Sequence, residues 1–182
     1  DRSVSRGLGD VYKRQVPKAR KGQDVIFNAE CLQLTDKYFY IHKALYHYRY
    51  LQESVTNRFN EKAQYYNEVA FENYERIINK FLLSEEYWNA YYARVVTRLY
   101  SCMRLYYFHP DNKKDKNTTY TELDDTLDKY PYCDALKKVD GSCLTKSQKV
   151  FVYFLKKRNY GMLKFLVDGR IWLKNIKGAR LK

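Results

Sequence analysis

The chain is poor in the residues that interrupt regular structure, with only 7 glycines and 3 prolines among 182 residues. Long helices are therefore possible over most of its length. No apolar run approaches the roughly 18 residues that a membrane-spanning helix needs. The four cysteines, Cys31, Cys102, Cys133 and Cys143, show neither a C-x-x-C pair nor metal-ligand spacing. This pattern is typical of reduced, mostly buried thiols in a cytosolic protein, and it argues against a zinc site.

Acidic residues are almost missing from the end of the chain. Between Gly141 and Lys182 there are eleven lysines and arginines but one acid, Asp168, so this segment carries most of the net charge of +13. Such a charge favours anionic partners. The segment also mixes its cations with Leu, Phe, Ile and Trp, which is typical of a helix lying on anionic lipid. A docked helix with a solvated basic face has the same composition, and both interpretations stay open.

Tyrosine, in contrast, is abundant, with 20 copies. Each tyrosine can bury a large ring while its hydroxyl still requires a partner, which suits packed helices with polar edges. Apolar periodicity of three and four predicts helices along most of the chain, with an N-cap at Ser84 and a stop at His109-Pro110. The predicted helices are Asp24–Leu34, Asn60–Leu83, a helix after Ser84 whose apolar positions run from Trp88 to Tyr106, Thr121–Lys138 (interrupted near Pro131), Thr145–Lys157 and Tyr160–Ile176.

Two aromatic runs near the start of the chain predict strands instead, namely Tyr38–His42 and Leu45–Tyr50. In the second run, His47 and Arg49 would share one face because side chains alternate along a strand. The polar stretch Asp111–Thr119 predicts a loop. The predicted fold class is therefore mainly α with a small β element.

Residues 22–58 carry the most informative pattern, GQDVIFNAECLQLTDKYFYIHKALYHYRYLQESVTNR. A Gln-Asp pair opens an amphipathic helix, and after a spacer come a Tyr-His-Tyr-Arg run and a Ser-x-Thr turn. This order resembles the acceptor-side segment of bacterial family 2 glycosyltransferases, which typically show Gly-Glu-Asp-x-x-Phe, Tyr-x-Tyr-Arg and Ser-x-Thr. The resemblance covers roughly Lys18 to Leu83.

The resemblance implies the C-terminal part of a GT-A type α/β glycosyltransferase followed by a helical tail. Residues 16–59 would end the catalytic domain, and residues 60–182 would form a C-terminal helical region with a basic amphipathic end. Ser5–Gln15 resembles the translation of a transposase-type sequencing adapter, so residues 1–15 are expected to be a disordered scar. The family's Asp-x-Asp motif, which holds Mg²⁺ or Mn²⁺ with the nucleotide-sugar donor, is expected before Val16. This fragment alone would then bind no cofactor and be inactive.

The same resemblance makes Asp24 the catalytic base, which takes the proton of the acceptor hydroxyl as the new C–O bond forms. A carboxylate at a helix N-terminus also serves as a plain helix cap, and the residues alone favour that role. The chain departs from the family pattern at Gln23, which stands where the family has Glu. The amide of Gln23 can still form a hydrogen bond with the sugar acceptor, but it cannot act as a second carboxylate.

Four further residues are candidates for substrate binding. Arg49 could pair with the diphosphate leaving group, or it could hold the loop through a structural ion pair. Ser54 matches the first position of the Ser-x-Thr turn. His47 could line the same cleft, although a lone histidine is more often a surface or packing residue. Arg58 is a weaker candidate of the same kind as Arg49.

The expected partners are a nucleotide sugar and a glycan or lipid-linked acceptor, with an anionic membrane surface as a further partner of the basic end. The expected location is cytoplasmic or peripheral on the inner membrane face, and the role is surface-polysaccharide synthesis. Two alternatives are a basic all-α nucleic-acid-binding module and a membrane-surface helical adaptor without catalysis. Against the first, the charge is concentrated at one end and no helix-turn-helix or RRM pattern is present, so no nucleic acid is expected as a partner.

Overall fold

The computed structural model describes residues 23–45 and 58–179, which divide into two compact units. The first unit contains residues 23–45 together with Tyr65–Leu83, and the second contains residues 58–64 and the chain from Ser84 onward. Helices make up most of the described chain, as the periodicity predicted. Within these ranges, no helix is both long enough and apolar enough to cross a bilayer.

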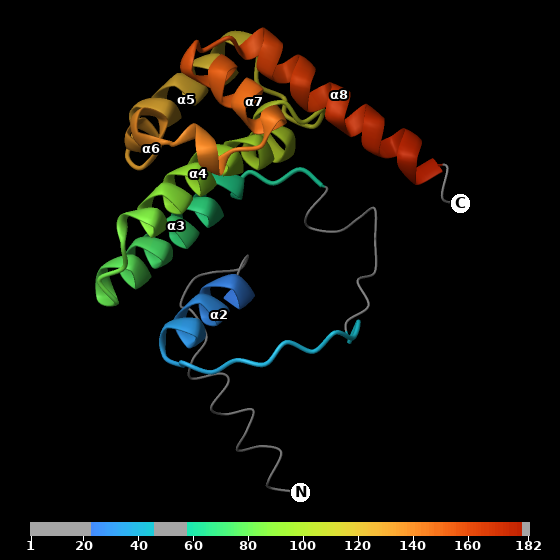
Figure 1. Ribbon diagram of the computed structural model, residues 1–182. Helices are drawn as coiled ribbons and strands as arrows, with labels where there is room; N and C mark the ends of the chain where they lie inside the picture. The colour runs from blue at the N-terminus through green and yellow to red at the C-terminus, as the bar shows by residue number, and fades with distance from the viewer. Residues whose placement is uncertain (1–22, 46–57, 180–182) are drawn as a thin grey trace, which may run out of the picture. The chain divides into compact units, whose positions relative to one another are not determined.

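The first unit pairs α2 (Gln23–Gln33) with most of α3 (Ala63–Lys80), coloured blue and green in Figure 1. Ile26 of α2 is completely buried and packs in one cluster with Val69 and Ile77 of α3. At the rim, Glu30 accepts a hydrogen bond of 2.8 Å from Arg76, so α2 and α3 are also joined by charge. That hydrogen bond, more than the opposing effect of burial, holds the pKa of Glu30 below its usual value.

The strand predicted at Tyr38–His42 is wrong. These residues are irregular, and their side chains are solvent-exposed, with Phe39 exposed to 93%. A strand needs a neighbour to satisfy its backbone groups, and no strand occurs in the described parts of the chain. The prediction was based on aromatic content alone, which does not supply the neighbouring strand on which these rings would pack. Most of the second predicted strand, Leu45–Tyr50, lies outside the described residues.

The second unit is built around α4 (Glu85–Cys102), which continues into the π-helical turn η1 (Met103–Tyr107). α4 packs against α6 (Tyr132–Lys138) and α7 (Lys146–Lys156), while α5 (Lys116–Asp128) packs on α6, and α8 (Tyr160–Ala179) on α7 and η1. The short 3₁₀ turn η2 (Gly141–Cys143) joins α6 to α7. Figure 1 shows this arrangement, running from green α4 to red α8. Its core includes Val95, Val96 and Leu99 of α4, all completely buried.

The helix ends follow local chemistry. Thr145 caps α7 in a reciprocal capping box with Gln148. Asp115 caps α5 by accepting hydrogen bonds from the backbone N–H groups of Asn117 and Thr118. The predicted loop Asp111–Thr119 therefore ends at Asp115, where α5 begins. Ser84 occupies the predicted N-cap position of α4, but its side chain makes no capping hydrogen bond.

Candidate functional site

Of the six site residues predicted from the sequence, the structure describes three. Gln23 is the first residue of α2, and Asp24 lies in the first turn with its side chain exposed. Arg58 is exposed and belongs to the second unit. His47, Arg49 and Ser54 lie outside the described residues. The structure therefore places Asp24 in the first turn of a helix.

A large groove, which the sequence did not predict, is present in the described part of the chain. It lies in the second unit between α4, η1, α7 and α8 and has a volume of about 1010 Å³. Its most distinctive side chains are four arginines, which come from three different elements. We call it the arginine groove, and the arginines that line it are Arg94 and Arg98 of α4, Arg104 of η1, and Arg170 of α8.

The spacing along α4 explains why three of the four arginines reach the same wall. Arg94 and Arg98 are four residues apart and therefore share a face of the helix. Ser101 follows on this face, and Arg104 comes three residues later in η1.

Negative charge inside the groove is scarce. Among the lining residues that the structure describes, the single acid is Asp168, and its carboxylate lies 2.9 Å from Lys164 Nζ. Asp168 is therefore already paired along its own helix, at i,i+4 spacing. The groove keeps a clear excess of positive charge.

Aromatic rings form the other part of the lining. The guanidinium of Arg170 lies over the ring of Tyr100, with 5.1 Å between Cζ and the ring centroid. Tyr100 in turn meets Phe151 edge-on, with centroids 5.8 Å apart. Burial raises the pKa of Tyr100, although Arg170 and Arg104 act in the opposite direction. Its hydroxyl is therefore neutral at physiological pH and available as a hydrogen-bond donor to a ligand.

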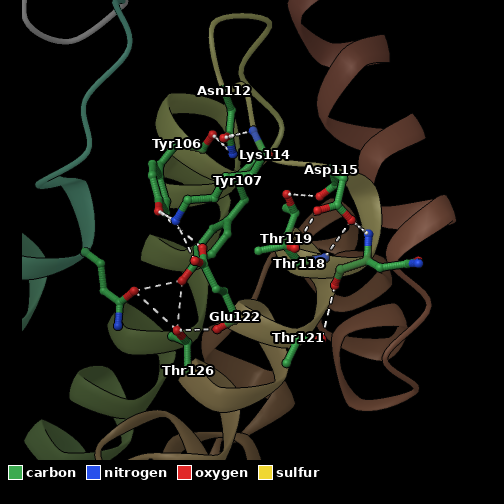
Figure 2. A network of polar contacts seen from close by, with 12 residues as sticks. Tyr106, Tyr107, Asn112, Lys114, Asp115, Thr118, Thr119, Thr121, Glu122 and Thr126 are labelled. Atoms are coloured by element: carbon green, nitrogen blue, oxygen red, sulfur yellow. Dashed lines mark hydrogen bonds and ion pairs between the residues drawn. The ribbon is translucent and has the colours of Figure 1, made fainter.

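One border of the groove is held by a polar network (Figure 2). The ammonium of Lys114 donates to the hydroxyl of Tyr106, at 2.7 Å, and to the carboxylate of Glu122 on α5. Asn112 also donates to the carbonyl oxygens of Tyr106 and Tyr107, at 3.2 and 3.1 Å. These contacts fix the connection between η1 and α5, from which His109 and Pro110 line the groove. The network thus has a clear structural role.

The described residues offer no metal centre. In residues 23–45 and 58–179, histidine, cysteine and carboxylate side chains do not gather in groups of three or more that could hold a metal ion. The arginine groove could instead hold an anion, because guanidinium groups form bidentate hydrogen bonds with phosphate or carboxylate. A search among protein-family models, curated proteins and solved structures found no match to this chain.

Proposed function

We propose that this chain is the C-terminal part of a family 2 glycosyltransferase of the GT-A type. The whole enzyme would transfer a sugar from a nucleotide-sugar donor to a surface-glycan acceptor. The observation that carries the proposal is the opening of α2 at Gln23-Asp24, followed in the sequence by the Tyr-His-Tyr-Arg and Ser-x-Thr runs. A helix that begins at this pair presents the carboxylate to solvent at its N-terminal end.

In this proposal, Asp24 accepts the proton of the acceptor hydroxyl while that oxygen bonds to the anomeric carbon of the donor. The positive end of the α2 dipole lies beside the carboxylate. Among the described side chains, none pairs with Asp24, so an acceptor could reach it. Arg49 would pair with the departing nucleotide diphosphate, whose negative charge grows as the glycosidic bond breaks.

A divalent cation supplies electrostatic stabilisation of the diphosphate in such enzymes. The described residues do not fit this role, since they lack a suitable group of ligands. In this proposal, the cation and the nucleotide would instead be held by the Asp-x-Asp motif that the family resemblance implies.

The test replaces Asp24 with Asn in the protein encoded by the complete gene. We expect sugar transfer to fall by about 10²–10⁴-fold with unchanged donor binding, because a general base contributes on that scale. Asp36→Asn is the matched control, since Asp36 is an exposed aspartate shortly after α2 and should be dispensable. Unchanged turnover in Asp24→Asn would remove Asp24 from the mechanism. A complete gene without an upstream Asp-x-Asp would count against the family assignment itself.

A further inference from the structure

Helix α8 has a second apolar face that the fold does not use. Leu163 and Val167 point into the core and are almost completely buried. On a different side of the helix, spaced by three and four residues, lie Phe165, Gly169 and Trp172, with Met162 one turn before them. Phe165 is 68% exposed and Trp172 is 63% exposed. We call Met162, Phe165, Trp172 and the neighbouring exposed Leu173 the α8 stripe.

An exposed stripe of large apolar side chains indicates a surface that contacts something apolar. The stripe takes no part in the core, because Leu163 and Val167 form the buried face of α8. The stripe is also not isolated from the arginine groove. Trp172 belongs to both, since it lines the groove and is largely exposed on α8. Cationic and apolar surfaces therefore meet at one residue.

We propose that this surface binds an anionic lipid at a membrane, with the phosphate headgroup in the arginine groove and the α8 stripe in the adjoining acyl region. Guanidinium groups suit a phosphate, which they can bind through two parallel hydrogen bonds. Tryptophan suits the boundary between headgroups and acyl chains, because its ring is apolar and its N–H is polar. The combination of a basic and an apolar face is the one found in interfacial helices.

The exposed lysines nearby add long-range attraction. Lys149, Lys156 and Lys157 of the α7 region are all exposed, and an anionic membrane attracts such residues over about a Debye length. A nucleic acid would share the charge complementarity, but protein–DNA interfaces are more polar and would leave Phe165 and Leu173 without a partner. The stripe therefore favours lipid. The proposal is independent of sugar transfer, because Asp24 has no part in it.

The first test measures flotation of the full chain with vesicles of phosphatidylcholine mixed with phosphatidylglycerol, against phosphatidylcholine alone. We expect binding to the anionic vesicles only. Arg94→Gln with Arg170→Gln should weaken it about ten- to thirty-fold, since each basic residue near an anionic surface contributes about 1 kcal/mol. The matched control is Lys113→Gln with Lys137→Gln, two exposed lysines that do not line the groove. We expect its effect to stay below about threefold.

The second test reports on the stripe through fluorescence. The chain has two tryptophans, so Trp88→Phe leaves Trp172 as the single tryptophan, which is excited selectively over the tyrosines. We expect its emission to shift to the blue with anionic vesicles and to be quenched by brominated lipid. Trp172→Ala should weaken vesicle binding about tenfold, because a large apolar side chain is no longer buried. Tyr153→Ala, at an exposed aromatic residue of α7 outside the groove, should leave binding unchanged.

Several results would overturn the proposal. They are equal binding to neutral vesicles, equal losses in the arginine and lysine pairs, and a Trp172 emission that vesicles do not change. Tighter binding to a short DNA duplex than to anionic vesicles would favour the nucleic-acid alternative instead. Binding of inorganic phosphate without binding of vesicles would indicate a soluble ligand. Unchanged helical circular dichroism in each variant ensures that a loss reflects the surface and not the fold.

Discussion

Replacing Tyr107 with phenylalanine should destabilise the second unit, because this side chain joins three elements. Tyr107 lies in η1 and is only 3% exposed. Its hydroxyl donates to Gln64 Oε1 at 2.7 Å and lies 2.8 Å from Thr126 Oγ1 of α5. Burial raises the pKa of Tyr107, so its hydroxyl stays protonated and keeps its role as a donor. Figure 2 labels Tyr107 and Thr126 among the residues of the network.

The size of the loss in stability depends on the hydrogen bonds that Gln64 and Thr126 can still form after the substitution. Tyr107→Phe keeps the ring and removes one hydroxyl, so no large cavity forms. Gln64 Oε1 loses its shorter donor, and the single hydrogen of Thr126 Oγ1 can then go either to Gln64 Oε1, at 3.2 Å, or to the carbonyl oxygen of Glu122, at 2.9 Å. Leaving a buried polar group without its partner costs about 1–3 kcal/mol. Because Thr126 can replace the lost donor of Gln64 only by leaving the Glu122 carbonyl, we expect a loss of about 1–2 kcal/mol in the free energy of unfolding.

Urea denaturation followed by far-UV circular dichroism measures this loss, which should lower the midpoint with an unchanged slope. Thr126→Val removes the other hydroxyl, and the double variant Tyr107→Phe, Thr126→Val completes a thermodynamic cycle. We expect a coupling energy of at least about 0.5 kcal/mol, because the two groups are in direct contact. Strict additivity of the two losses, or a single-variant loss below about 0.3 kcal/mol, would refute the argument that this network is cooperative.

Two further predictions concern a helix cap and a pH dependence. Thr145→Ala should lower the free energy of unfolding by about 1 kcal/mol, because it removes the capping box of α7. Ser147→Ala, in the same first turn, should change it little. Equal losses for the two variants in urea denaturation would contradict this prediction. The hydrogen bond from Arg158 lowers the pKa of Asp128 in the folded protein. This pair therefore stabilises the fold fully at pH values above the unfolded-state pKa of about 3.9. The stabilisation is lost as the pH falls through the lower folded-state pKa. Asp128→Asn should therefore lower stability by a constant amount above roughly pH 5 and by less below pH 4, and a difference that does not change with pH would contradict the assignment.

The sequence predicted the helices well because their cause is local. Apolar spacing identified α2, α3, α4, α7 and α8, and Ser84 and His109-Pro110 marked the two ends of the segment that forms α4 and η1. The start of α5 was missed although its signal was present, since Asp115 is a good N-cap before a helix-compatible run. The strand at Tyr38–His42 failed because strand formation depends on a partner, which aromatic content does not supply.

The arginine groove could not be predicted, because it depends on tertiary contacts. Arg94, Arg98 and Arg104 have the spacing of one helix face, and this signal was visible in the sequence. This spacing, however, is also typical of the ordinary polar side of an amphipathic helix. Only the packing of α7 on α4, and of α8 on η1, brings Arg170 and Phe151 to the same wall and turns that side into a groove.

The two proposals depend on different units of the chain, and this makes them separable by experiment. Asp24 belongs to the first unit, and every residue of the arginine groove belongs to the second. A substitution in the arginine groove should therefore weaken binding of the protein to an anionic membrane without changing the proposed proton transfer at Asp24. In the complete enzyme we expect Arg94→Gln with Arg170→Gln to slow transfer to an acceptor embedded in anionic vesicles. The same variant should leave transfer to a soluble acceptor unchanged, whereas Asp24→Asn should lower transfer to both acceptors by about 10²–10⁴-fold. Equal losses with both acceptors in the arginine variant would show that the groove acts in the reaction itself, and the division of roles argued from the structure would be wrong.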